Sequence, residues 1–185
     1  VAMEGEPEAV MDYYNALIAE NDKRNVQQTV LPDGRVQTVS GTGEACVSKI
    51  GLYNAQGESV EIVKCGEPVE LRIIVKINTH LDSLVLGYGI KDRLGQVMFG
   101  TNTWHTHQVL NNLGSGDCYE FKVLFAANLG EGSYSIQTAL VDRETHLSAN
   151  YEWRDYAILF DVINVDKPVF AGSQWMNARI EIKLK

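Results

Sequence analysis

The residues best suited to chemistry lie in one stretch, residues 83–104, and their chemistry is that of binding rather than catalysis. Gly87 and Gly89 fall on one face of a predicted strand, where two glycines weaken the strand and point to a compensating role. Gly100-Thr101-Asn102-Thr103-Trp104 then supplies amide, hydroxyl and indole groups close to that glycine floor. A ring that stacks on a sugar, beside neutral hydrogen-bonding groups, is typical of a carbohydrate site. We therefore predict a shallow sugar-binding depression on the outside of a β-sheet.

The predicted site draws further residues from neighbouring strands. Gln137 and Ser135 join it if their strand lies beside the glycine strand, a point that the sequence leaves open. Arg72 or Arg93 would read a charged substituent on the glycan. An ordinary solvated face is the alternative for all of these polar side chains. The full predicted set of ligand-binding residues is Arg72, Gly87, Tyr88, Gly89, Asn102, Thr103, Trp104, Ser135 and Gln137.

Other chemistries lack their sequence signatures. There is no GxxxxGK[ST] and no GxGxxG, and Gly87-Tyr88-Gly89 lies within a strand instead of at a strand-to-helix turn, so phosphate binding is not predicted. There is no HExxH, and the spacing of His105 and His107 matches no strong zinc pattern. There is no GxSxG, and the acids at 142, 144, 152 and 155 are typical of an acidic surface. We predict no catalytic residue, no metal and no cofactor, and a glycosidase stays open as an alternative.

Composition limits the partners that the chain can have. It has 185 residues, of which 45% are hydrophobic, and this suits one globular domain with a sizeable core. A net charge of -8 repels phosphates and anionic lipid, so no nucleic-acid partner is predicted. No apolar run reaches the roughly 20 residues that span a bilayer. Three widely spaced cysteines, Cys46, Cys65 and Cys118, favour reduced thiols in a cytosolic protein, with one disulfide as the alternative.

The elements that must position the site are predicted to be strands. Residues 6–20 have the apolar stripe of a short helix with Pro7 in its first turn, and residues 21–43 are polar, as in a linker. From Glu44 onward the apolar residues alternate, most clearly between 69 and 77. Residues 105–116 are predicted to be a loop. Strands are expected at 45–53, 59–64, 69–77, 83–93, 96–104, 118–127, 133–143, 156–165 and 178–184. The pattern predicts an all-β, immunoglobulin-like antiparallel β-sandwich with an N-terminal helix and linker.

Several short motifs, taken in order, resemble a known family. Residues 5–15, Gly-Glu-Pro-Glu-Ala-Val-Met-Asp-Tyr-Tyr-Asn, resemble the last helix of ATP-binding subunits in polysaccharide ABC exporters. Four later motifs resemble the C-terminal domain of Wzt, the ATPase subunit of O-antigen exporters in Gram-negative bacteria. They are Gly41-Thr42-Gly43-Glu44-Ala45, Cys65-Gly66-Glu67-Pro68-Val69, Val97-Met98-Phe99-Gly100-Thr101-Asn102-Thr103 and Gly132-Ser133-Tyr134. The resemblance covers nearly the whole chain.

The resemblance implies a function and a set of partners. Residues 1–43 would be the final helix of a missing ATP-binding domain plus a linker, and residues 44–185 would be a β-sandwich carbohydrate-binding domain. That domain would bind the O-antigen polysaccharide, at its modified non-reducing end in several systems, and couple chain completion to export across the inner membrane. The missing domain would join it to the membrane-spanning transporter subunit, so the protein would be cytoplasmic and peripheral to that membrane.

A homodimer with an exchanged terminal strand is also implied. Residues 178–184 are the best candidate for the exchange, because Ile180, Ile182 and Leu184 alternate after a long irregular stretch. The alternative function, from a different class, is a structural sandwich that serves dimerisation or docking and binds no glycan.

Overall fold

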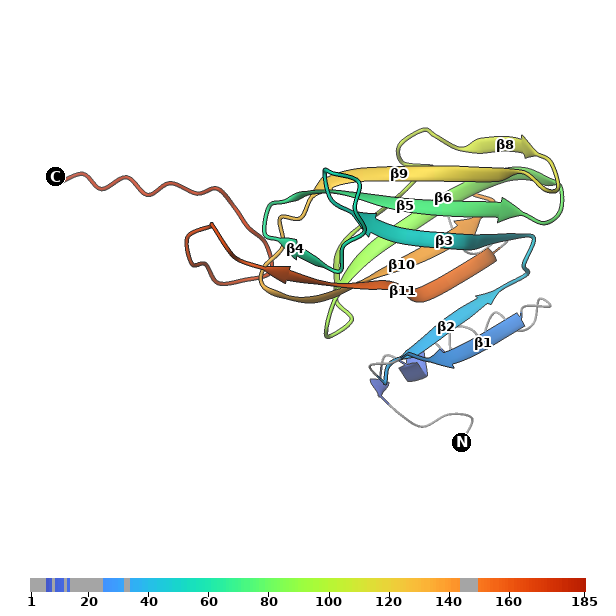
Figure 1. Ribbon diagram of the computed structural model, residues 1–185, viewed down its shortest axis with the longest axis horizontal. Helices are drawn as coiled ribbons and strands as arrows, with labels where there is room; N and C mark the ends of the chain where they lie inside the picture. Colours follow the sequence, from blue (N-terminus) through green and yellow to red (C-terminus); the bar gives the residue numbers. More distant parts are fainter. Residues whose placement is uncertain (1–5, 8, 12, 14–24, 32–33, 144–149) are drawn as a thin grey trace.

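Alternating apolar residues build two sheets that pack face to face in the computed structural model, which describes residues 6–7, 9–11, 13, 25–31, 34–143 and 150–185 (Figure 1). Within these residues the larger sheet has the order β1-β2-β11-β10-β6-β7, with β4 parallel to β11 and β8 beside β6. The smaller sheet has the order β3-β5-β9. The strands are β1 (Asn25–Val30), β2 (Val36–Gly41), β3 (Ala45–Tyr53), β4 (Ile62–Lys64), β5 (Pro68–Ile77), β6 (Leu81–Asp92), β7 (Val97–Asn102), β8 (Leu110–Leu113), β9 (Cys118–Ala126), β10 (Gly132–Val141) and β11 (Asn150–Ile163).

The core lies between the two sheets and follows the alternation in the sequence. In β5 every second residue from Val69 to Ile77 is buried, as the period of two requires. Leu86 and Ile90 of β6 and Ile136 of β10 face it from the larger sheet and belong to the same apolar cluster. Burying each such side chain contributes about 1.5–3 kcal/mol. The predicted all-β sandwich is confirmed.

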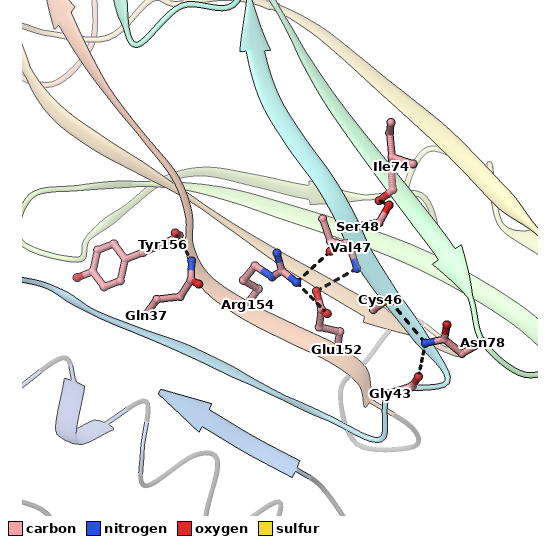
Figure 2. Close-up of polar contacts among 10 residues, drawn as sticks. All are labelled: Gln37, Gly43, Cys46, Val47, Ser48, Ile74, Asn78, Glu152, Arg154 and Tyr156. Atoms are coloured by element: carbon pink, nitrogen blue, oxygen red, sulfur yellow. Dashed lines mark hydrogen bonds and ion pairs between the residues drawn. The ribbon is translucent and has the colours of Figure 1, made fainter. Parts of the chain in front are cut away.

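Residues 25–30 and 36–41, which were expected to belong to a polar linker, form the paired strands β1 and β2. β2 joins the larger sheet beside β11, where Ser40 lies opposite Trp153. Gly41 permits this approach, because its φ is 150° and a Cβ there would lie 2.3 Å from the carbonyl oxygen of Tyr151. Hydrogen bonds stand in for the apolar alternation that the hairpin lacks: the Gln37 side chain, for example, donates to the Tyr156 carbonyl (Figure 2).

Other boundaries also differ from the sequence-based expectations. The predicted loop 105–116 contains the short strand β8, and the last long strand begins at Asn150 instead of residue 156. Residues 178–184 form no strand within the single chain and extend away from the sandwich (Figure 1). Residues 7, 9–11 and 13 of the predicted N-terminal helix are helical, with the Val10 N–H donating to the Glu6 carbonyl, and residues 8, 12 and 14–20 lie outside the described residues.

Two side chains of β11 form hydrogen bonds with backbone groups at the edge of β3 that faces the larger sheet (Figure 2). The Val47 N–H donates to Glu152 Oε1 at 3.2 Å, and Arg154 donates to the Val47 carbonyl at 3.0 Å. Arg154 also pairs with Glu152 Oε2 at 3.1 Å. Burial raises the pKa of the Glu152 carboxyl, and the Arg154 guanidinium opposes that rise. These two side chains of β11 therefore satisfy backbone groups that a free strand edge would leave open.

Candidate carbohydrate-binding depression

A hollow of about 210 Å³ lies on the outer face of the larger sheet, over β6, β7, β10 and β11. It contains the glycine floor that the sequence predicts. Its volume is below the roughly 300–1,000 Å³ of pockets that enclose drug-sized ligands, so it suits one small ring better than a longer ligand. We call it the glycine depression. Its lining residues are Gly87, Tyr88, Gly89, Val97, Gly100, Thr101, Asn102, His105, Gln137, Thr138, Ala139 and Trp153.

Strand register brings the predicted floor and rim together. Gly87 lies opposite Asn102 on one side and Ala139 on the other, while Gly89 lies opposite Gln137. A Cβ added at Gly87 would meet its neighbours at 3.6–3.7 Å, which is ordinary contact. At Gly89 it would come within 3.0 Å of the Gln137 side-chain nitrogen. The Gln137 amide therefore lies over Gly89, and Gly87 is the more open part of the floor.

The aromatic ring at the depression is that of Trp153, which the prediction left out. Trp153 lies opposite Ala139 in the sheet register, on the outer face. Trp104 belongs to the turn after β7, is 41% exposed and does not line the hollow. That turn is held by Asn102 Oδ1, which accepts from the His105 N–H at 2.9 Å and so leaves the amide N–H groups of Asn102 for a ligand. The turn also places His105 in the lining.

The other predicted residues occupy different positions. Tyr88 points its ring toward the core side, 6.1 Å from the Phe99 ring, and its burial raises the pKa of its hydroxyl. Thr103 Oγ1 accepts from the Leu86 N–H at 3.0 Å and helps to close the β6–β7 pair. Ser135 shares the outer face but is buried beside the depression, outside its lining.

Arg72 lies on the other sheet and is not brought to the depression. It projects from the outer face of β5, where it pairs with Glu70 and stacks 4.1 Å from the centre of the Tyr53 ring. The Arg72 hydrogen bond lowers the pKa of the Glu70 carboxyl. Arg72 lines a separate hollow beside the turn between β3 and β4.

A bulge in β11 shapes the sheet behind the depression. Residues 155–157 lie opposite Gln137 alone, and Tyr156 has a φ of 44°, unusual for a residue other than glycine. The bulge carries Asp155, which is fully buried and lies 3.3 Å from Lys91 Nζ. Bulges of this kind are common beside functional sites, where they redirect side chains.

A second, larger hollow of about 480 Å³ opens between the two sheets. It lies beneath β9, where Tyr119, Phe121 and Val123 are only half-buried, and above Leu86 and Tyr88 of β6. β9 pairs with β5 alone among the described strands, so its other edge is open. The cleft therefore lies beside a strand edge that no other described strand pairs with.

Comparison with known proteins identifies the family. The family profile described as the Wzt C-terminal domain matches residues 36–176, which is more than half of the chain. The chain belongs to the Wzt C-terminal domain family. No match was found among curated protein sequences. No helix among the described residues is long and apolar enough to cross a bilayer.

One solved structure in particular shows the same fold. A crystal structure of the C-terminal domain of Wzt superposes with a TM-score of 0.69 at 18% identity and covers 85% of this chain and 93% of that one. A Niemann-Pick type C2 protein from Japanese carpenter ant has a TM-score of 0.45 at 10% identity, covering 63% and 91% of the two chains. The CARDB domain of the PF1109 protein from Pyrococcus furiosus has a TM-score of 0.40 at 13% identity, covering 63% and 90%. The latter two are too distant to inform the function.

Proposed function

We propose that this Wzt C-terminal domain binds the end of an O-antigen polysaccharide in the glycine depression. The observation that carries the proposal is the convergence of a glycine floor, the Gln137 and Asn102 amides and the Trp153 ring in one hollow. Stacking on an indole beside neutral amides is the usual chemistry of sugar recognition. The hollow is shallow and open to solvent, so we expect affinities between about micromolar and millimolar, or about -8 to -4 kcal/mol.

The role of binding is recognition, without a chemical step on the glycan. The bound chain end would report that the lipid-linked polysaccharide is complete, and the attached ATP-binding domain and membrane-spanning subunit would then export it. This places the domain at the cytoplasmic face of the inner membrane. β2, which follows the N-terminal segment, lies directly beside Trp153 in the sheet, so the depression adjoins the part of the chain nearest the proposed ATPase.

We also propose a homodimer in which residues 178–184 of each subunit complete the smaller sheet of the other. The open edge of β9 is the acceptor, because contacts from Glu152 and Arg154 already occupy the edge of β3. Phe99 of β7 lies opposite Ile90 on the core side of its sheet but is 51% exposed, as expected if a covering strand is missing. The apolar side chains at 180, 182 and 184 would enter the cleft beneath β9.

Trp153→Leu and Trp104→Leu variants test the site against O-polysaccharide released from the lipopolysaccharide of the bacterium that encodes the chain. We expect Trp153→Leu to weaken binding about two- to tenfold, since an aromatic contact contributes about 0.5–1.5 kcal/mol. Isothermal titration measures the affinity, and circular dichroism checks that each variant is folded. A loss with Trp104→Leu alone would move the site to the turn after β7. Absent glycan binding by an intact dimer would favour the structural role, and shortened glycan chains would establish a glycosidase.

A further inference from the structure

The C-terminal chain forms the start of an antiparallel ladder just beyond the end of β9. Leu129 and Gln174 make an isolated antiparallel bridge, and the Trp175 N–H donates to the Asn128 carbonyl at 3.1 Å. Both contacts belong to one register, in which each step forward from Gln174 is matched by a step back from Leu129. Beyond Trp175 the ladder stops, and residues 178–184 extend away from the sandwich (Figure 1). The bridge therefore defines a direction and a register for any strand that continues the ladder along β9.

Continuing that register along β9 sets apolar side chains opposite apolar side chains. The core-facing residues of β9 are only half-buried, whereas Ile180 and Ile182 of the C-terminal segment are 89% and 92% exposed. The register places Ala178, Ile180, Ile182 and Leu184 opposite Phe125, Val123, Phe121 and Tyr119, respectively. Directly opposite residues of an antiparallel pair share a face, so these apolar side chains would all point into the cleft beneath β9.

The other face of the same register pairs opposite charges. Glu120 and Lys122 lie on the exposed face of β9. Lys183 falls opposite Glu120, and Glu181 falls opposite Lys122. Opposite charges directly across a strand pair are stabilising and like charges are destabilising. The alternation of apolar residues and the order of the charges therefore favour the same register independently.

Neighbouring registers lose one of these two matches. A shift by one residue moves the apolar side chains of the segment to the solvent face. A shift by two residues sets Glu181 opposite Glu120 in one direction and Lys183 opposite Lys122 in the other. A parallel strand could also set Glu181 opposite Lys122, but it would run against the antiparallel bridge at Leu129. The register of the bridge is thus the antiparallel one that satisfies both faces.

We infer that residues 178–184 of the partner subunit pair antiparallel with β9 in this register, and that two cross-strand ion pairs, Glu120 with Lys183 and Lys122 with Glu181, select the second copy. This inference rests on the proposed homodimer and adds its strand direction, its register and its charged contacts. Exchange of an identical element between subunits keeps the contacts that the element could make in its own chain, so the register carries over to the partner's segment.

A disulfide made with one substitution tests the register in the full chain. Residue 185 falls opposite Cys118, which is exposed. Directly opposite residues have Cα atoms about 4.5–5.5 Å apart, within the span of about 4.4–6.8 Å that a disulfide needs. In a Cys46→Ser background, where the other native thiol, Cys65, is buried, we expect Lys185→Cys to give a covalent dimer in a glutathione redox buffer. Non-reducing gel electrophoresis measures its yield.

Two matched variants report the alternative pairings. Lys183→Cys would meet Cys118 only after a shift by two residues, and Asn177→Cys would meet it only in a parallel arrangement. We expect each to give at least about fivefold less covalent dimer than Lys185→Cys. A higher yield from either variant would overturn the register and leave the exchange in place.

The remaining disulfide outcomes separate the register from the homodimer. A bond between residues 185 and 118 within one subunit, identified by mass spectrometry of a monomer, would overturn the exchange and with it the proposed homodimer. If none of the three variants forms a linkage in a protein that light scattering shows to be a dimer, the inference fails and the dimer uses another interface.

A charge-reversal cycle tests the ion pairs. Lys183→Glu sets two carboxylates opposite each other, so we expect the dissociation constant of the dimer to rise about five- to tenfold, measured by analytical ultracentrifugation. Adding Glu120→Lys restores opposite signs and should recover most of the loss. Lys64→Glu makes the same change of net charge at an exposed residue of β4 and serves as the control, with the dimer unaltered. Equal weakening by both single variants, or no recovery in the double variant, would overturn the pairing.

Discussion

At Gly87 one methyl group distinguishes an open floor from an ordinary sheet surface. A Cβ there would lie 3.6 Å from Asn102 Cβ and 3.7 Å from Ala139 Cβ, so alanine fits without a clash. We expect Gly87→Ala to stabilise the protein by about 0.5–1 kcal/mol, because glycine loses more chain entropy on folding. The added methyl narrows the depression, and we expect O-polysaccharide binding to weaken about tenfold. Thermal unfolding and isothermal titration measure the two effects.

Gly89→Ala provides the comparison for that variant. Its Cβ would lie 3.0 Å from Gln137 Nε2 and would push the amide aside instead of filling open space. We expect it to weaken binding as well, but with no gain in stability. If Gly87→Ala raises stability and leaves glycan affinity unaltered, the ligand does not rest on this floor.

The Glu152–Arg154 pair stabilises the edge of β3, and we expect its contribution to stability to change with pH. Burial raises the pKa of Glu152 above its ordinary value of 4.5, so the folded state holds this proton to higher pH than the unfolded chain does. Its contribution to stability is therefore full below about pH 4.5 and is lost as the pH rises through the raised pKa. We expect the free energy of unfolding of the wild type, minus that of Glu152→Gln, to fall over this range.

Urea unfolding of the two proteins at a series of pH values measures that difference. Both proteins contain the other carboxyl groups, so their contributions cancel in this difference. Glu70 is one of them: its pKa is lowered, so its contribution to stability is lost as the pH falls, opposite to that of Glu152. A difference that grows as the pH rises would mean that Arg154 outweighs burial and lowers the Glu152 pKa instead.

The strands whose apolar residues alternate in the sequence were predictable, and so was most of the floor of the site. β5, β6 and β10 each bury one face against the core, and a period of two then assigns every other residue to the outer face. Gly87 and Gly89 were placed on the outer face by this reasoning alone. Their proximity to Gln137 needed the pairing of β6 with β10, which the sequence does not encode locally.

The missed elements share a physical cause: their stability comes from pairing and hydrogen bonds instead of an apolar face. The β1–β2 hairpin carries polar residues on both faces, so periodicity gives no strand signal. The first part of β11 holds Glu152 and Asp155, whose burial depends on ion pairs with Arg154 and Lys91, respectively. Because the strand was predicted to begin only at residue 156, the sequence did not assign Trp153 to a sheet face, although continuing the strand back from 156 would have placed it on the outer face.

For the whole molecule, the arrangement of the sheets separates the two proposed binding surfaces. The glycine depression uses the outer face of the larger sheet, while the cleft beneath β9 opens between the sheets. Tyr88 lies between them: it lines the glycine depression, and its ring points toward the cleft beneath β9. The proposed glycan recognition and the proposed subunit exchange therefore use different residues, which allows each to be tested without the other.

The dimer proposal predicts which part of the chain joins the subunits. Residues 178–185 form no strand in the single chain, and Ile182 there is 92% exposed, so deleting them should leave the sandwich folded. We expect the deletion to convert a dimer into a monomer and to leave glycoside binding at the depression within about twofold, because the site is built from β6, β7, β10 and β11. Size-exclusion chromatography with light scattering measures the mass.

A pair of matched double variants identifies the face that enters the cleft. Ile180→Ser with Ile182→Ser removes apolar side chains from one face of the segment, whereas Arg179→Ser with Lys183→Ser changes the other face. We expect only the isoleucine pair to dissociate the dimer, since burying each isoleucine contributes about 1.5–3 kcal/mol and the alternate face stays in solvent. A wild-type monomer, or a dimer that survives the deletion, would show that β9 does not receive this segment.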